Sequence, residues 1–85
     1  MRKIVTTIHD AKSEMYLNPV CGRTKGQAIR EFQQEANNPE SQLNKYPEDF
    51  TLFELGEYDD ITGMMHPHKT PKPIGKALEF LTREQ

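Results

Sequence analysis

The sequence has no tryptophan, a single cysteine and no long apolar run. Cys21 alone cannot form an internal disulfide or supply the thiolate set of a structural zinc site, so we expect a reducing cytosol as the setting. The apolar run near the N-terminus is too short and too polar for a signal peptide or a membrane span. These absences predict a soluble, unprocessed protein that does not contact the membrane.

Apolar residues are also scarce, at 34% of the sequence. The core must therefore rely on four phenylalanines and a few Ile and Leu residues. A chain of 85 residues predicts one domain, spanning residues 1–85. So small a monomer leaves much of its apolar surface incompletely buried, and we expect a homodimer or another homo-oligomer.

The formal net charge of -2 conceals an uneven distribution along the chain. Residues 1–30 are mainly basic, residues 31–60 hold nine acidic residues against Lys45 alone, and the last third is again weakly basic. If the two basic segments meet on folding, one side of the molecule is positive and the other negative. Such a molecule suits either polyanion binding or head-to-tail association of subunits.

Sequence patterns in the first half predict two strands and a helix. Residues 4–9 alternate with a period of two and are rich in β-branched side chains, which is typical of a strand with a buried face. Residues 16–21 predict a second short strand, at a sheet edge or bulged because Pro19 lacks an amide hydrogen. Thr24 and Gln27 match a capping box, so a helix should begin near Lys25 and end at the Asn-Asn-Pro of residues 37–39.

The second half predicts a loop over residues 40–48, a strand over residues 50–58 and a turn over residues 59–63. A return strand over residues 64–66 should end at Pro67, and the apolar spacing of residues 74–81 predicts a C-terminal helix. The fold class is therefore α+β. We expect an antiparallel sheet of about four strands with two helices on one face, in the order ββαββα.

Three groups of residues are candidates for a catalytic or metal site. His66 and His68 with Asp59 and Asp60 nearby form a weak candidate metal cluster, but ordinary exposed histidines and turn-forming carboxylates explain the pattern better. Cys21 has no marked oxyanion hole or orienting group beside it. We therefore expect no metal, no cofactor and no enzyme activity.

Basic and aromatic residues give the candidate DNA contacts. Arg23 and Lys25 stand at a predicted helix start, where free amides attract phosphate, and Arg30 extends the patch. Thr24 capping the helix, with these cations merely solvated, explains the pattern equally well. Tyr16 and Tyr46 are candidates for base stacking, although tyrosines are commonly half-buried. Lys72 and Lys76 provide a second phosphate track or simply keep the C-terminal segment soluble.

The most distinctive segment of the chain is Pro47-Glu48-Asp49-Phe50-Thr51-Leu52-Phe53-Glu54-Leu55-Gly56-Glu57, and the residues from Thr24 to Phe32 and from Gly75 to Leu81 add to it. Together these segments resemble the small nonstructural protein of gokushovirus-type microviruses. The resemblance implies a counterpart of the microvirus protein that turns genome replication toward single-stranded progeny synthesis and packaging. It also implies contact with DNA, the replication apparatus or the procapsid, and it supplies no catalytic residues.

The sequence therefore predicts a non-enzymatic viral protein of the host cytoplasm that binds single-stranded or replicating DNA. The alternative is a protein-interaction adaptor whose acidic hairpin, residues 57–60, contacts the replication initiator or capsid protein. A divalent-metal nuclease using Asp59 ranks behind both hypotheses.

Overall fold

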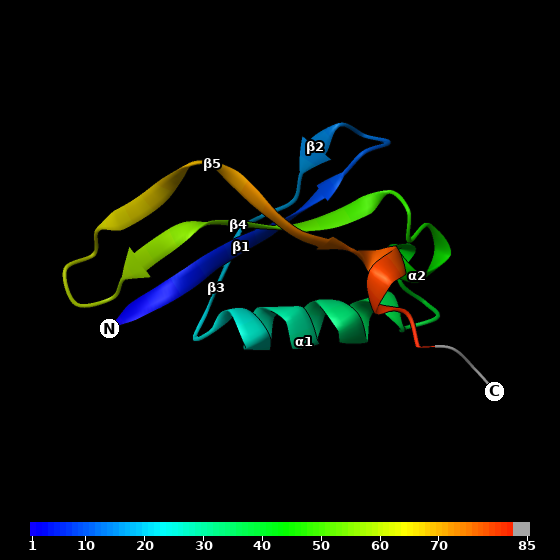
Figure 1. Ribbon diagram of the computed structural model, residues 1–85, viewed down its shortest axis with the longest axis horizontal. Helices are drawn as coiled ribbons and strands as arrows, with labels where there is room; N and C mark the ends of the chain where they lie inside the picture. Colours follow the sequence, from blue (N-terminus) through cyan, green and yellow to red (C-terminus); the bar gives the residue numbers. More distant parts are fainter. Residues whose placement is uncertain (83–85) are drawn as a thin grey trace.

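A curled antiparallel sheet forms the frame of the protein in the computed structural model, which describes residues 1–82 (Figure 1). The strands are β1 (Arg2–Asp10), β2 (Met15–Tyr16), β3 (Val20–Gly22), β4 (Phe50–Asp59) and β5 (Met65–Lys76). The helices are α1 (Lys25–Ala36), the short α2 (Gln42–Lys45) and the 3-10 helix η1 (Ala77–Phe80). The predicted α+β class is confirmed.

The two long central strands follow from their alternating sequences. β1 pairs with β4 in antiparallel register, with Ile8 opposite Leu52, and β4 pairs in turn with β5. On its other side β1 pairs with β2 near one end and with β3 near the other. The prediction of a single strand over residues 16–21 is therefore wrong in detail. Two short strands, β2 and β3, occupy this part of the chain, and Pro19, which has no amide hydrogen to donate, lies between them.

Helix α1 begins where the capping pattern predicts. The Thr24 hydroxyl accepts a hydrogen bond from the Gln27 amide at 3.0 Å, while the Gln27 side chain accepts one from the Arg23 amide at 3.0 Å. The reciprocal bond thus reaches one residue further back than in a standard capping box. The helix ends at Ala36 as predicted. Within residues 1–82, no helix has the length and apolar character needed to cross a membrane.

Residues 64–81 differ from the prediction. Pro67 does not end the strand, because β5 continues to Lys76, and the predicted C-terminal helix is reduced to the single turn η1. β5 is an edge strand, and one side of an edge strand needs no amide donors, so its prolines are tolerated there. The predicted 40–48 loop also contains α2, which is capped by the Ser41 hydroxyl and held by the buried Leu43.

The core lies between α1 and one face of the sheet (Figure 1). Its buried members are Phe32, Ala36, Leu43, Phe50, Leu52 and Ala77. Ile8 packs against this group from β1, which fixes the face of β1 that looks toward the helix. Asn37, just after α1, closes the core at the C-terminal side: its side-chain amide donates to the Phe80 carbonyl at 3.0 Å, and its side-chain oxygen accepts from the Thr82 amide at 2.7 Å.

Candidate nucleic-acid interface

The sheet face opposite α1 carries three aromatic rings that contact one another. Successive side chains along a strand point to opposite faces of the sheet. Because Ile8 and Leu52 face the core, their neighbours His9 and Phe53 point to the other face. Tyr16 on β2 is paired in register with His9 and joins them. We call this side of the sheet the open face, because no helix among residues 1–82 lies over it (Figure 1). We call His9, Tyr16 and Phe53 the aromatic cluster.

The three rings are tilted rather than stacked in parallel. The Tyr16 centroid lies 4.6 Å from that of His9 and 5.6 Å from that of Phe53, and His9 and Phe53 are 6.2 Å apart. These separations and the steep interplanar angles are typical of edge-to-face aromatic packing. Tyr16 remains 48% exposed, while His9 and Phe53 are half-buried. The cluster is thus a fixed apolar surface that solvent reaches mainly at Tyr16.

A lysine completes the row of residues across this face. His9 is opposite Thr51, and Thr51 is opposite Lys76, so Tyr16, His9, Thr51 and Lys76 follow one another across four strands. Directly opposed residues of antiparallel strands project to the same face. The structure therefore places a cation on the same surface as the aromatic cluster. Two predicted DNA-contact residues, Tyr16 and Lys76, therefore lie on the same face, at the two ends of this row.

The basic residues at the start of α1 lie away from the open face, on the side of the helix layer. Arg23, Lys25 and Arg30 are all exposed, but Lys25 and Arg30 differ by five positions and so point about 140° apart around the helix axis. They do not form a single patch with one another. Arg23 instead shares a pocket with Lys3 from β1, a residue that sequence reasoning did not select.

The remaining predicted contacts are also separated. Lys72 is opposite Glu54 and Lys76 is opposite Thr51, and positions three apart on β4 face opposite sides of the sheet. The predicted second phosphate track is therefore divided between two faces. Tyr46 lies at the end of α2, is 55% exposed and lines a pocket with Lys12 that includes none of the three rings.

Basic and acidic segments meet rather than segregate. Because β1 runs antiparallel to β4, the Arg2 guanidinium reaches Glu57 at 2.8 Å and the Lys3 ammonium lies 3.9 Å from Asp60. Asp59 is used in the turn, where the Ile61 amide donates to its carboxylate at 2.9 Å. This bond is the largest cause of an Asp59 pKa below its ordinary value of 3.8, and the Thr62 amide adds to it.

The two histidines considered for metal binding lie on β5. His68 shares a 2.6 Å hydrogen bond with the Glu54 carboxylate, and His66 is opposite Glu57. Over residues 1–82, no three His, Cys, Asp or Glu side chains gather in a metal-ligand arrangement.

Sequence reasoning selected Tyr16 but missed His9 and Phe53. Their signal was present in the alternation of β1 and β4, which separates His9 from Ile8 and Phe53 from Leu52. What the alternation does not give is the pairing of these strands with each other and with β2.

Fold and surface together define a small α+β protein with one helix-covered face and one open aromatic face. Comparison with known proteins then gives the family, since the model of the Phage ORF5 protein family matches residues 3–80. The match covers nearly the whole chain, and the chain therefore belongs to the Phage ORF5 protein family and is a small phage protein. No curated protein and no solved structure matches it.

Proposed function

We propose that this phage protein binds single-stranded DNA through its open face, without enzyme activity. The observation that carries the proposal is the aromatic cluster with Lys76 in the same row of the sheet. Proteins that bind single strands combine aromatic side chains, on which bases stack, with cations that contact the backbone. A sheet face carrying exposed rings is one of the recurrent ways to present both.

Single strands fit this surface better than a duplex. Base faces are free to stack on Tyr16 only when they are unpaired, whereas a duplex offers phosphates and groove edges. Duplex binding without base contacts needs many phosphate contacts, and a chain of net charge -2 with interleaved ion pairs offers few. The affinity should therefore come more from stacking than from neutralisation of phosphates.

The phage family and the resemblance to gokushovirus-type microviruses support a role in the viral replication cycle. We propose that the protein acts in the host cytoplasm, where it helps turn genome replication toward single-stranded DNA synthesis and packaging. A homodimer would bring two open faces to one strand. Viral replication or capsid proteins are its expected partners in that step.

Fluorescence anisotropy of labelled single-stranded and duplex DNA, titrated with the protein at two salt concentrations, tests the proposal. We expect preference for the single strand and a shallow salt dependence, because few phosphates are contacted. Absence of binding to either DNA at low salt would contradict it.

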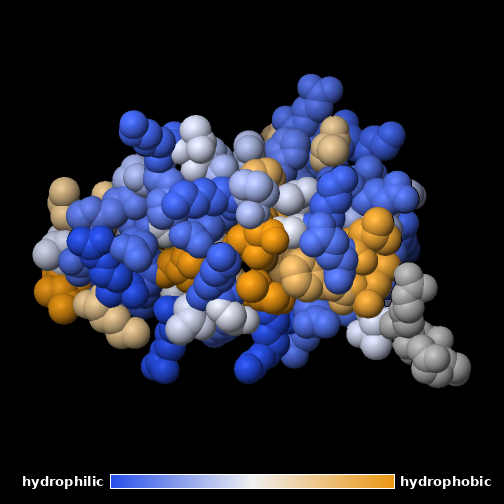
Figure 2. Space-filling model, viewed as in Figure 1, coloured by the Kyte–Doolittle hydropathy of each residue, from blue (hydrophilic) through white to orange (hydrophobic). Residues whose placement is uncertain are grey.

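One observation favours protein interaction as a second candidate function. The acidic residues of the predicted adaptor surface, Glu57, Asp59 and Asp60, already form ion pairs or hydrogen bonds within the molecule. The tip of the β4–β5 hairpin, by contrast, exposes apolar side chains. Ile61 is 82% exposed, Met64 58% and Met65 53%. Apolar residues accordingly mark this end of the molecule, at the left of Figure 2. An adaptor would use these side chains, rather than the acids, to contact a viral replication or capsid protein, and salt-resistant capture of such a partner without DNA affinity would favour it.

A further inference from the structure

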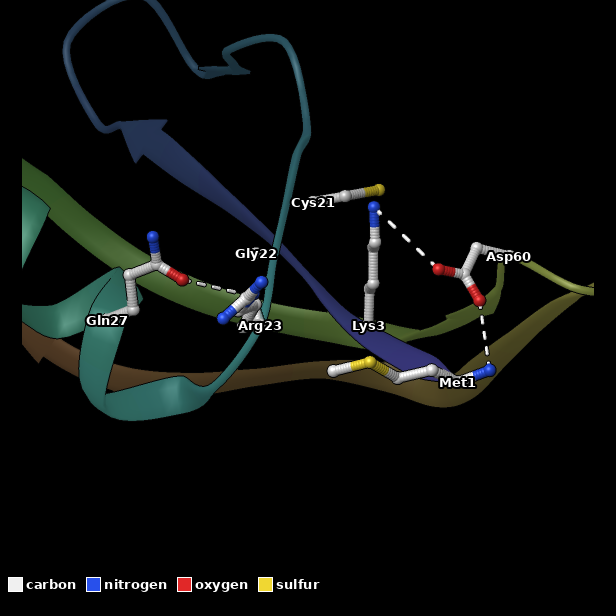
Figure 3. A pocket seen from close by; sticks show the side chains of 7 residues that line it. All are labelled: Met1, Lys3, Cys21, Gly22, Arg23, Gln27 and Asp60. Atoms are coloured by element: carbon white, nitrogen blue, oxygen red, sulfur yellow. Dashed lines mark hydrogen bonds and ion pairs between the residues drawn. The ribbon is translucent and has the colours of Figure 1, made fainter.

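A pocket of about 330 Å³ lies between the start of β1, the β3–α1 junction and the β4–β5 turn. Lys3 and Arg23, 20 positions apart in the chain, both line it, and Asp60 is its acidic residue (Figure 3). The pocket is separate from the aromatic cluster, because its lining includes none of the three rings. Two cations from distant segments meeting in one hollow make it a candidate anion site.

The backbone that carries Arg23 is held in place. Its amide donates to the Gln27 side chain at 3.0 Å, and the same glutamine donates to Glu31 at 3.3 Å. Gln27 thus fixes the backbone of Arg23, as the dashed line in Figure 3 shows. Within residues 1–82, the Arg23 guanidinium itself has neither a hydrogen bond nor an ion pair. An arginine with an anchored backbone and free donors is prepared for a planar or tetrahedral oxyanion.

The Asp60 carboxylate already occupies part of this pocket as an anion. One oxygen lies 3.0 Å from the Met1 amine, and the other lies 3.9 Å from the Lys3 ammonium. Its amide also donates to the Met1 carbonyl at 3.2 Å, which ties the β4–β5 turn to the start of β1. The carboxylate reaches Lys3 but makes no contact with Arg23, so the cations are only partly neutralised.

We propose that this pocket binds a phosphate group through Arg23 and Lys3, and that Asp60 is an intramolecular competitor for the same cations. A phosphate offers several oxygens and more negative charge than a carboxylate, and it can bridge the two side chains. The site does not depend on the aromatic cluster. The phosphate comes either from a DNA backbone or from a small phosphorylated molecule, and the two sources share this chemistry.

Competition by Asp60 makes the prediction directional. Asp60→Asn removes the negative charge and keeps a side chain of the same shape. This variant should therefore bind inorganic phosphate at least about threefold more tightly than the wild type does. Arg23→Gln should weaken phosphate binding about tenfold, since it removes charge-assisted hydrogen bonds. Lys25→Gln is the matched control, because Lys25 is an adjacent exposed cation that does not line the pocket, and we expect a change within about twofold.

The experiment is a titration with sodium phosphate at constant ionic strength, followed by amide and arginine side-chain NMR signals of the full chain. Retained signal dispersion shows that each variant is folded. Equal or weaker phosphate binding by Asp60→Asn, or equal losses in Arg23→Gln and Lys25→Gln, would overturn the proposal. Lys3→Gln provides a second variant should Arg23→Gln not fold.

A parallel titration with a short oligothymidine identifies the source of the phosphate. If Arg23→Gln weakens both ligands, the site takes a backbone phosphate. If it weakens inorganic phosphate alone, the site takes a small phosphorylated molecule. Loss of phosphate binding by Arg23→Gln with intact binding of DNA at the aromatic cluster would support the phosphate site. Intact phosphate binding by a Tyr16→Ala variant that no longer binds DNA would support it as a site independent of the proposed DNA-binding function.

Discussion

The Cα atom of Pro67 lies 2.6 Å from the point where a Cβ atom on Gly56 would stand. The two residues are opposite each other in the β4–β5 pairing, next to an irregularity in the register at Leu55. Gly56 also has a φ of +155°, a conformation that side chains rarely adopt. Close approach of the two backbones at this point is therefore possible only with glycine on β4.

Gly56→Ala should destabilise the protein by about 1–3 kcal/mol, because the new methyl group meets the backbone of His66 and Pro67 and neither can move cheaply. Urea unfolding followed by circular dichroism measures the change. Gly26→Ala is an informative control, since its added Cβ lies 3.8 Å from the Thr24 hydroxyl and inside α1. That variant should be stabilised by about 0.5–1 kcal/mol, and equal effects at both positions would show that the close approach is absent.

The parts of the fold that were predictable are those set by residues close together in the sequence. The start of α1 is set by residues within four positions of one another, Arg23, Thr24 and Gln27, so its pattern was decisive. β1 and β4 alternate strictly enough to be identified without knowing their partners. β5 was predicted only over residues 64–66, because its prolines argue against a longer strand, and only its position at the edge beside β4 makes them acceptable.

The prediction of a C-terminal helix over residues 74–81 was wrong for a related reason. The prediction of a helix rested on the helical spacing of the apolar residues Ile74, Ala77, Leu78 and Leu81, after a proline-containing segment that could initiate a helix. In the structure Ile74 belongs to β5, Ala77 is buried by the turn of η1, and Leu78 is exposed. Likewise Tyr16 and Lys76 were selected singly, but their common face depends on the strand order β2-β1-β4-β5, which joins residues 60 positions apart.

Tyr16→Ala should weaken binding of single-stranded DNA by about 1–3 kcal/mol, the usual contribution of one stacked base, which corresponds to about 5- to 150-fold in Kd. Fluorescence anisotropy at low salt measures it. Tyr46→Ala is the matched control, because Tyr46 is a comparably exposed tyrosine outside the aromatic cluster. We expect it to bind as the wild type does, and the reverse order of effects would move the interface to the α2 end.

The Asp59 carboxylate gives the hairpin a defined pH dependence. Its folded-state pKa is lowered from 3.8, chiefly by the Ile61 amide, so the ionised form is favoured by folding. The resulting stability is complete above pH 3.8 and declines as the pH falls below that value. Asp59→Asn, which keeps a side-chain oxygen for the turn, should show a smaller loss of stability between pH 5 and pH 2.5 than the wild type in urea unfolding. A parallel decline in the two proteins would mean that other carboxylates account for the acid response.

Self-association, if the protein forms the proposed homodimer, should use the hairpin tip. Prolines 67, 71 and 73 interrupt the hydrogen-bonding pattern that strand addition at the β5 edge requires. The tip offers Ile61 and Met64 instead, both largely exposed. Ile61→Ser with Met64→Ser should therefore shift the sedimentation-velocity profile of the protein toward monomer, and the free energy of unfolding of the monomer should change by less than about 0.5 kcal/mol because neither side chain is buried. A wild-type protein that sediments as a monomer at every concentration would contradict the homodimer, and a variant that dimerises as the wild type does would place the interface elsewhere.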